Sequence, residues 1–316
     1  MQSNRIFITG AAGFIGSTLS KKLLESGNKV IGIDNFDPYY NIKIKQKNIQ
    51  ELEQFEGFEF IEGDIRDKEV LKTFPKFDIL IHIAAKAGVR PSLENPGEYM
   101  DVNIIGTQNL LELCKEYNCK KFIFASSSSV YGVNPQIPWT EAMNLQPISP
   151  YASSKLSCEM LGHVYANLYD IQFLALRFFT VYGPKQRPDL AIHKFVHLIL
   201  NDQPITLYGD GSTSRDYTFV DDIVDGILGA VHYKKTKFEI INLASNRRIS
   251  LMDLVQTLED VIGKKASINY TEEQAGDVRV TYGDISKARN LLGYAPKVEL
   301  KEGLTRFYQW YTAMES

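Results

Sequence analysis

Short apolar runs alternate with longer amphipathic stretches through roughly the first 180 residues of the chain. The apolar runs are Ile6–Ile8, Lys29–Ile33, Phe58–Glu62, Ile79–Ile83, Lys121–Ala125 and Phe173–Phe178. In most of them apolar residues follow one another without polar alternation, which is typical of parallel strands buried on both faces. Such strands, separated by helical stretches, predict an α/β fold with a doubly wound parallel sheet of the Rossmann type.

The segments between and after these runs carry helical patterns. Helices are expected at Ser17–Ser26, Gly97–Tyr117, Tyr151–Leu168, Ala191–Leu200, Val220–Val231, Leu251–Ile262, Ile285–Leu292 and Leu300–Tyr311. After about residue 180 the alternation loosens and turn-forming residues become frequent. We therefore expect a sheet domain at residues 1–180. Residues 181–316 should form a smaller mixed C-terminal lobe that binds substrate, with segments returning to the sheet domain.

Composition and charge narrow the range of partners. The 316 residues suit about two domains. Lys plus Arg number 35 and Asp plus Glu number 38, so a formal charge of −3 predicts no nucleic-acid or membrane partner. The first apolar run starts too early for a signal peptide. Cys114, Cys119 and Cys158 lack metal-ligand spacing, so we predict no metal site. Three cysteines leave one over in any pairing, so we interpret them as free thiols of a cytoplasmic protein.

A glycine-rich turn follows the first apolar run. Gly10, Gly13 and Gly16 lie between a predicted strand and a predicted helix. Glycine lets a diphosphate approach the backbone closely, and the helix N-terminus favours its negative charge. Asp34 ends the second strand, 18 residues past Gly16, where a carboxylate accepts from the adenosine ribose hydroxyls of a dinucleotide. Asn35 follows it with no adjacent Arg, which favours NAD over NADP.

Other strand ends extend this predicted cofactor site, because doubly wound sheets bind ligands at the carboxyl ends of their strands. Asp64 follows the third strand and could reach the adenine amine, although it could also cap the next helix. Small residues follow the fourth strand and suit a close approach of the cofactor. The predicted cofactor-binding residues are Gly10, Gly13, Phe14, Ile15, Gly16, Asp34, Asn35, Asp64, Ile65, Ala84, Ala85, Lys86, Asn103 and Lys155.

Tyr151 and Lys155 are four residues apart and face the same side of a predicted helix. A free tyrosine has a pKa of about 10, so a general base at neutral pH needs about 4 kcal/mol of differential stabilisation. We expect the Lys155 ammonium and a bound nicotinamide to lower the Tyr151 pKa. The fifth strand ends in four serines, Ser126–Ser129, and Ser127 is the best candidate to share a hydrogen bond with the reacting hydroxyl.

These motifs together resemble the extended short-chain dehydrogenases/reductases, and most closely the branch of UDP-glucuronate 4-epimerases. The resemblance covers nearly the whole chain. Its motifs are the Thr-Gly-Ala-Ala-Gly-Phe-Ile-Gly turn, the serine run before Val-Tyr-Gly, Tyr151-x-x-x-Lys155, Ala-Gly-Val-Arg90, the Thr180 and Arg187-Pro-Asp segments, Arg215-Asp-Tyr and Gly276-Asp-Val. Many relatives that act on neutral sugars carry Asn where Thr180 stands.

The resemblance implies an NAD-dependent isomerase that inverts C4 of a UDP-sugar, here UDP-glucuronate to UDP-galacturonate, through a transient 4-keto sugar. Tyr151, Lys155 and Ser127 would be catalytic. Substrate-binding residues would be Arg90, Ser128, Ser129, Thr180, Arg187, Lys194, Phe195, Tyr208, Arg215 and Arg279. Of these, Arg215 and Arg279 would bind the diphosphate and Tyr208 would pack on uracil. The family also implies a homodimer that pairs the helices Gly97–Tyr117 and Tyr151–Leu168.

A uronate substrate adds a requirement, because its oxidised form is a β-keto acid that can lose CO₂. Hydroxyls of Ser127, Ser128, Ser129 and Thr180, with Arg187 nearby, form a hypothetical clamp that holds the carboxylate where it cannot leave. Alternatives remain open: a 4-epimerase of neutral or N-acetylated UDP-hexoses, a sugar-nucleotide dehydratase or decarboxylase, or a non-catalytic NAD-binding sensor. A dehydratase needs an acid–base pair before Val-Tyr-Gly, where this chain has only serine.

Overall fold

The structure is a computed structural model that describes residues 4–272 and 278–315, so Gly276 of the Gly-Asp-Val motif lies outside it. Its centre is a parallel sheet of seven strands in the order β11-β6-β5-β4-β1-β2-β3. The strands are β1 (Arg5–Thr9), β2 (Lys29–Asp34), β3 (Phe58–Glu62), β4 (Ile79–His82), β5 (Lys121–Ser127), β6 (Gln172–Phe178) and β11 (Phe238–Leu243). The order reverses at β1, which pairs with both β2 and β4, and the predicted doubly wound sheet is therefore confirmed.

The edge strand β11 was not predicted from the sequence. It pairs in parallel with β6, from Phe238 opposite Phe173 to Leu243 opposite Phe178. Only its last three residues are fully buried, and it has a Glu and an Asn among its apolar residues. Its strand character therefore depends on pairing with β6 rather than on a clear local pattern.

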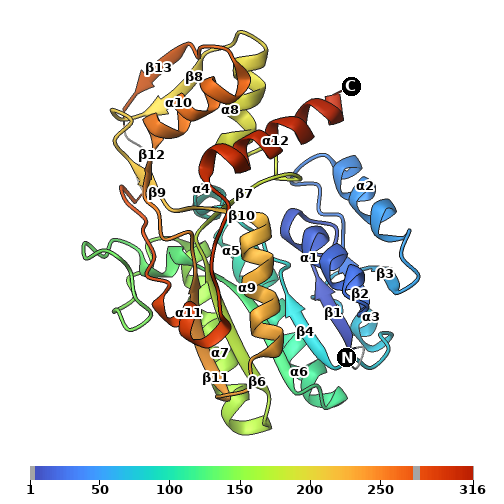
Figure 1. Ribbon diagram of the computed structural model, residues 1–316. Helices are drawn as coiled ribbons and strands as arrows, with labels where there is room; N and C mark the ends of the chain where they lie inside the picture. The colour runs from blue at the N-terminus through green and yellow to red at the C-terminus, as the bar shows by residue number, and fades with distance from the viewer. Residues whose placement is uncertain (1–3, 273–277, 316) are drawn as a thin grey trace.

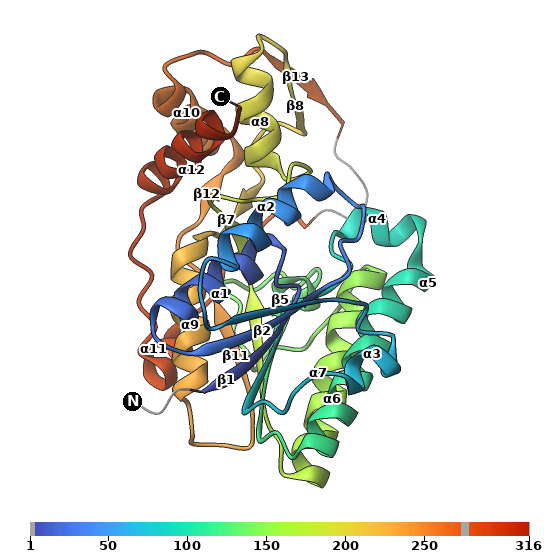
Figure 2. The same cartoon turned by 90° about the vertical axis from the view of Figure 1, so that its right-hand side faces the viewer.

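Helices cover both faces of the sheet (Figure 2). One face carries α1 (Phe14–Glu25), α2 (Ile42–Leu52), α9 (Val220–His232) and α11 (Ser286–Leu292); the other carries α3 (Lys68–Lys72), α5 (Pro96–Tyr99), α6 (Gly106–Tyr117) and α7 (Pro150–Tyr169). Alternate residues of β1 enter different cores, with Ile6 and Ile8 in one and Phe7 in the other. Burial of both strand faces explains why the sheet strands read as continuous apolar runs.

The predicted helix Gly97–Tyr117 is interrupted in the structure. Between α5 and α6 lies a π-helical turn, η1 (Met100–Ile105), which contains the buried Asn103. The Asn103 side chain accepts from the backbone N–H of Lys86 at 2.8 Å and donates to the Lys86 carbonyl at 3.1 Å. Single π-helical turns within α-helices often occur at functional sites, and this one holds the chain segment after β4.

The C-terminal lobe lies beyond the carboxyl edge of the sheet, at the top of Figure 1. It contains α8 (Ala191–Leu200), α10 (Leu251–Ile262) and α12 (Leu300–Glu315) around a separate apolar core. Three two-stranded sheets, unforeseen from the sequence, connect its segments: β7 (Thr180–Tyr182) with β10 (Tyr217–Phe219), β8 (Ile205–Tyr208) with β13 (Ile268–Thr271), and β9 (Ser214–Arg215) with β12 (Ile249–Ser250). Two short helices, α4 (Val89–Glu94) and η2 (Ser128–Tyr131), complete the structure. Among the described residues, no helix combines the length and apolar character needed to span a bilayer.

Candidate active site

A cavity of about 540 Å³ opens at the carboxyl edge of the sheet, where the strand order reverses. Its wall includes the predicted cofactor-binding residues Gly10, Gly13, Phe14, Ile15, Gly16, Asp34, Asn35, Asp64, Ile65, Ala84, Ala85, Lys86 and Lys155. It also includes the predicted catalytic and substrate-binding residues Ser127, Ser128, Ser129, Tyr151, Thr180, Arg187 and Arg215. One cavity thus brings together residues that lie up to about 200 positions apart in the sequence.

The glycine turn allows a ligand to approach the backbone of α1. Gly10 has a φ of +72°, and a Cβ there would lie 2.8 Å from the backbone nitrogen of Ala84. At Gly16 a Cβ would lie 2.0 Å from the Gly10 carbonyl oxygen. No side chain caps the N-terminus of α1 at Gly13. The close packing and the uncapped helix end fit a bound diphosphate at this place.

Asp34 lies at the end of β2, as predicted, and its carboxylate is already hydrogen-bonded within the protein. It accepts from the backbone N–H of Ala12 at 3.2 Å and of Phe36 at 2.9 Å. Lys45 on α2 forms a buried ion pair with it at 3.5 Å. Sequence reasoning missed Lys45, because three lysines alternate along α2 and nothing local distinguishes the one that turns inward.

Asp64 also lines the cavity, at the place where the adenine of the dinucleotide is predicted to bind. It accepts from the Arg66 guanidinium at 2.8 and 3.0 Å and from Asn35 at 2.9 Å. The hydrogen bonds from Arg66 lower the pKa of the Asp64 carboxyl to about 2. The alternative role of Asp64 as a helix cap is wrong, because Asp67 caps α3 by accepting from the backbone of Glu69 and Val70.

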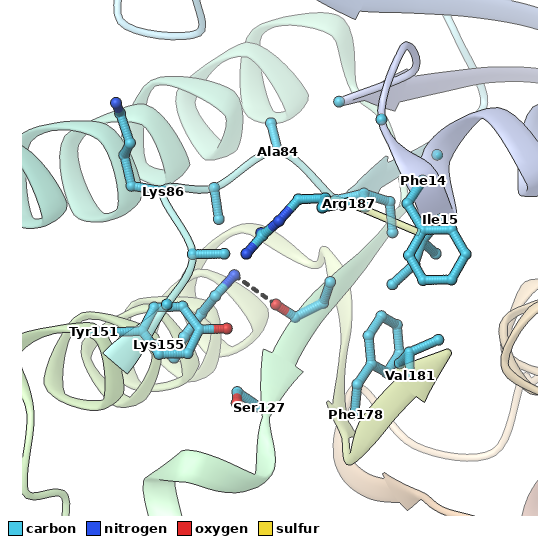
Figure 3. Close-up of a pocket in the computed structure, with 18 of the residues that line it drawn as sticks. Phe14, Ile15, Ala84, Lys86, Ser127, Tyr151, Lys155, Phe178, Val181 and Arg187 are labelled. Carbon is cyan, nitrogen blue, oxygen red and sulfur yellow. Dashed lines mark hydrogen bonds between the residues drawn. The ribbon is translucent and has the colours of Figure 1, made fainter. Parts of the chain in front are cut away.

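Tyr151 and Lys155 lie one turn apart near the start of α7, and the predicted helix is confirmed. Ser149 caps this helix by accepting from the Ala152 N–H at 3.1 Å, and Pro150 occupies its first turn. Both side chains point into the cavity (Figure 3). The local sequence therefore fixes the spacing of the two groups, and the helix start directs them to the end of β5.

The electrostatics of this pair differ from the expectation. Burial raises the pKa of Tyr151, while a hydrogen bond with Ser127 and the charge of Arg187 lower it. The Lys155 ammonium donates to the Ala125 carbonyl at 2.7 Å, and a dashed line from Lys155 marks this bond in Figure 3. Burial lowers the pKa of Lys155 itself to about 8. The net effect in this structure raises the pKa of Tyr151, against the expected lowering, because burial outweighs the opposing effects of Ser127 and Arg187.

Arg187 is held in the cavity by two residues that sequence reasoning did not assign. Its guanidinium forms two hydrogen bonds with the Asp189 carboxylate, at 2.8 and 2.9 Å, and lies 5.3 Å from the centre of the Tyr39 ring. Asp189 could have been found from the sequence, because an acid two residues after an arginine is a natural ion partner. Tyr39 gave no such signal, since its contact joins segments about 150 residues apart.

The serine run is ordered by its own hydroxyls. Ser127 accepts from both the backbone N–H and the hydroxyl of Ser129, at 3.2 and 2.9 Å. Ser126 instead donates to the buried Glu159 at 2.5 Å. Thr180 lies across the cavity on β7, where its N–H donates to the carbonyl of Asp216 at 3.0 Å. Among the residues that the structure describes, the cavity wall presents hydroxyls from two strand ends and includes no carboxylate from the serine run.

Three predicted site residues lie outside the cavity wall because of helix packing. Asn103 is buried behind the wall, where it holds the backbone of Lys86. Phe195 is buried in the apolar core of the lobe, because α8 turns that side inward. Lys194, the preceding residue on the same helix, is exposed. Direct contacts of these three residues with a ligand stay predictions.

Three further predicted residues lie at the border between the domains rather than in the cavity. The Arg90 guanidinium lies 4.9 Å from the centre of the Tyr208 ring, so these two residues contact each other across the gap between α4 and β8. The side chain of Arg279 is exposed, and its carbonyl accepts from Arg215 Nη1 at 3.3 Å. Of the predicted arginines, Arg187 and Arg215 line the cavity.

The chain is similar to known proteins along nearly its whole length. A family described as GDP-mannose 4,6 dehydratase matches residues 7–307. A UDP-glucuronate 4-epimerase from Thermodesulfobacterium geofontis is 43% identical, over 96% of this chain and 94% of its own. The crystal structure of UDP-glucuronic acid 4-epimerase from Bacillus cereus with UDP-glucuronic acid and NAD is 41% identical, with a TM-score of 0.94 over 98% of this chain and 99% of that one. UDP-glucose 4-epimerase from Thermotoga maritima, with UDP-glucose, is 33% identical with a TM-score of 0.91 over 99% of this chain and 100% of that one.

Proposed function

Because this chain belongs to the GDP-mannose 4,6 dehydratase family of extended short-chain dehydrogenases/reductases, we propose that it is an NAD-dependent UDP-sugar 4-epimerase. The proposed reaction interconverts UDP-glucuronate and UDP-galacturonate. The observation that carries the proposal is that Tyr151, Lys155 and Ser127 line the same cavity as the glycine turn and Asp34. A proton acceptor and a dinucleotide site within one cavity suit the oxidation of a secondary alcohol.

Residues of the glycine turn, Asp34 and Lys155 would hold the dinucleotide. The missing Cβ atoms at Gly10 and Gly16 leave backbone accessible for its diphosphate, and Asp34 supplies a carboxylate for ribose hydroxyls. Bound NAD⁺ would supply the hydride acceptor and return the same hydride later, so no external oxidant is needed.

Tyr151 is the proposed general base and acid. It takes the proton of the C4 hydroxyl during oxidation and returns a proton to O4 during reduction on the opposite face. Ser127, which lines the cavity together with Tyr151, would donate to the substrate oxygen as it becomes a carbonyl. The nearby charge of Arg187 favours the phenolate and so offsets part of the rise in pKa caused by burial. Lys155 fixes the helix against β5 through its bond to Ala125.

The carboxylate of a uronate substrate is proposed to lie among the hydroxyls of Ser127, Ser128, Ser129 and Thr180. The 4-keto uronate loses CO₂ readily when its carboxylate bond aligns with the ketone π system. Hydrogen bonds from two strand ends would hold the carboxylate away from that alignment. Arg187 contributes charge at the border of this group, while Asp189 keeps its guanidinium in one orientation.

The name of the matching family raises the alternative of a dehydratase, and the serine run argues against it. Elimination of water at C5 and C6 needs an acid–base pair, and the residues from Ser126 to Ser129 supply hydroxyls only. A 4-epimerase of neutral UDP-hexoses keeps the same catalytic residues. It differs in the group at C5, which is the group that Thr180 would contact.

We propose that the protein is a homodimer. Ile105 on η1 and Met160, Val164 and Leu168 on α7 are exposed apolar residues, with relative accessibilities of 44 to 66%. The three on α7 are spaced four residues apart and form one stripe on the outer surface of the sheet domain. Pairing this stripe with that of a second copy would bury it in a four-helix arrangement.

We also propose a location in the reducing cytoplasm. The three buried cysteines form no disulfide, which suits this location.

The test is to incubate the purified protein with UDP-glucuronate and added NAD⁺, and to separate the sugar products by chromatography. Formation of UDP-galacturonate without CO₂ release is expected. Turnover of UDP-galactose or an N-acetylated UDP-hexose, with no turnover of UDP-glucuronate, would contradict the uronate assignment. A lack of turnover with any UDP-sugar, in protein shown to bind NAD⁺, would contradict the enzymatic proposal.

A further inference from the structure

A buried ion pair lies directly behind the proposed catalytic residues. Glu159 follows Lys155 by one turn of α7, and Arg177 lies on β6; both side chains are almost completely buried. Arg177 donates to Glu159 through Nε at 2.9 Å and through Nη2 at 2.8 Å. Buried pairs of this kind often contribute little net stability compared with apolar residues of similar size. Net stability alone therefore does not account for this pair.

The contacts of α7 with β5 show what the pair does. Tyr151, Lys155 and Glu159 are spaced four residues apart on one face of the helix, and the last two bond to consecutive residues of β5. Lys155 donates to the Ala125 carbonyl and Glu159 accepts from Ser126, while Tyr151 and Ser127 line the same cavity. The position of Ser127 against Tyr151 is thus linked to the bond between Ser126 and Glu159 one residue before it.

Apolar packing alone would not fix this register. The buried side of α7 is a stripe of small residues, Ser154, Cys158, Gly162 and Ala166, and a Cβ at Gly162 would lie 2.3 Å from the Phe173 ring. A smooth stripe lets the helix approach the sheet closely but offers few ridges to resist sliding or rotation. Directional bonds from Glu159 to Ser126 and Arg177 supply the resistance.

Arg177 anchors the pair to the rest of the sheet. Its neighbours in register are Ser126 on β5 and Asn242 on β11, so the three residues form a polar row across three adjacent strands. The guanidinium lies 4.8 Å from the centre of the Tyr131 ring, and the Tyr131 hydroxyl donates to Asn242 at 2.7 Å. The row crosses the sheet at the level from which the serine run departs.

From these contacts we infer that Glu159 and Arg177 are positioning residues for the epimerase reaction, holding α7 and β5 in the register that puts Ser127 against Tyr151. The inference rests on the proposed function for its kinetic consequences. Its geometric claim concerns the position of Ser127 relative to Tyr151, and this can be tested without turnover.

The decisive variant replaces both partners, Glu159→Leu with Arg177→Met, because removing one alone leaves an unpaired buried charge. The double variant should fold with a free energy of unfolding close to that of the parent protein. We expect kcat to fall about 10- to 100-fold, since small misplacements of reacting groups have effects of this size. KM for the UDP-sugar should change less than about threefold, because the diphosphate contacts lie elsewhere.

A second readout follows the ionisation of Tyr151 in cofactor-free protein. The ultraviolet absorbance of tyrosinate is titrated in each protein and compared with the same protein carrying Tyr151→Phe. Displacement of the Ser127 hydroxyl from Tyr151 should raise the Tyr151 midpoint by about one pH unit, because Ser127 lowers the Tyr151 pKa. A role confined to stability would leave this midpoint unchanged.

The matched control is Asp222→Asn on α9, where a buried carboxylate accepts from the backbone N–H groups of Lys297 and Val298, remote from the cavity. It should lower stability and leave kcat and the Tyr151 midpoint unchanged. A folded double variant with the kcat and Tyr151 midpoint of the parent would overturn the inference.

If the double variant does not fold, the fallback is Ser126→Ala, which cuts only the link to β5 and should lower kcat about three- to tenfold. Unchanged kcat and an unchanged Tyr151 midpoint in that variant would also overturn the inference. If the parent protein turns over no UDP-sugar, the proposed function fails, and the Tyr151 titration alone decides the positioning role.

Discussion

Lys155 donates its hydrogen bond to the carbonyl oxygen of Ala125, at 2.7 Å, although Tyr151 lies only one helical turn away. The bond ties α7 to β5 at the residue just before the serine run. The Lys155 ammonium is buried there, and this burial lowers its pKa to about 8. The charged form of Lys155 therefore destabilises the folded protein at neutral pH, in exchange for placing a cation beside the reaction site.

This burial predicts a pH dependence of stability. The folded-state pKa of Lys155 lies below its unfolded value of 10.5, so between the two values the unfolded chain binds more protons and stability rises with pH. The advantage of Lys155→Met over the parent protein should thus shrink by about 2 to 3 kcal/mol from pH 7 to pH 10. Urea unfolding of cofactor-free protein at several pH values measures it. A constant difference between the two proteins would show that Lys155 titrates normally.

Removal of the Tyr151 hydroxyl should abolish most activity. Tyr151→Phe keeps the ring in place but removes the proton acceptor, so kcat should fall by about 10² to 10⁴. NAD⁺ binding, measured by calorimetry, should remain. Tyr165→Phe makes the same change on the same helix, away from the cavity, and should leave kcat unchanged. Equal kcat in Tyr151→Phe and the parent would exclude Tyr151 as the acid–base group.

Thr180 should affect the fate of the carboxylate rather than the rate of oxidation. Thr180→Asn removes a hydroxyl from the wall of the cavity and should either increase the decarboxylated product or raise KM for UDP-glucuronate. Thr180→Ser keeps the hydroxyl and should behave like the parent. Product analysis by mass spectrometry distinguishes the two variants. If Thr180→Asn gives the parent's product ratio and KM, Thr180 is not part of the clamp.

The glycine turn can be tested with two glycine-to-alanine variants. In Gly16→Ala the new Cβ would meet the Gly10 carbonyl oxygen at 2.0 Å, so the turn must distort, and we expect loss of NAD⁺ binding. Gly97→Ala on α5 meets nothing within 4 Å and should leave stability within about 1 kcal/mol of the parent, or slightly raise it. Calorimetric NAD⁺ titration and thermal melting check both. Normal NAD⁺ affinity in Gly16→Ala would place the cofactor elsewhere.

The apolar stripe on α7 predicts the oligomeric state. Leu168→Asp puts a charge at the most exposed position of the stripe and should convert a dimer to a monomer in light scattering at micromolar concentration. Tyr270→Lys changes a similarly exposed side chain on the lobe and should leave the dimer intact. A monomeric parent protein would contradict the proposed dimer.

Local patterns were enough to identify the central strands and the turn that the proposed cofactor site needs. Gly10, Gly13 and Gly16 lie within seven residues, and Tyr151 and Lys155 within one turn, so their spacing is a property of the chain itself. The run Ile6–Ile8 predicted β1 because a strand buried on both faces has little polar alternation. β11 escaped prediction because its mixed sequence becomes a strand only by pairing with β6.

What only the tertiary structure decided is how groups distant in sequence meet. The order of residues places Arg187 two positions from Asp189. The contact of Arg187 with Tyr39 and the effect of its charge on the Tyr151 pKa, however, depend on the lobe folding back over the sheet. The bond of Lys155 to Ala125, rather than to Tyr151, depends on how closely α7 packs against β5. A sequence fixes spacing along one element because backbone geometry is periodic. The pKa values and contacts of the site depend on burial and on partners from other elements, which exist only once the chain is folded.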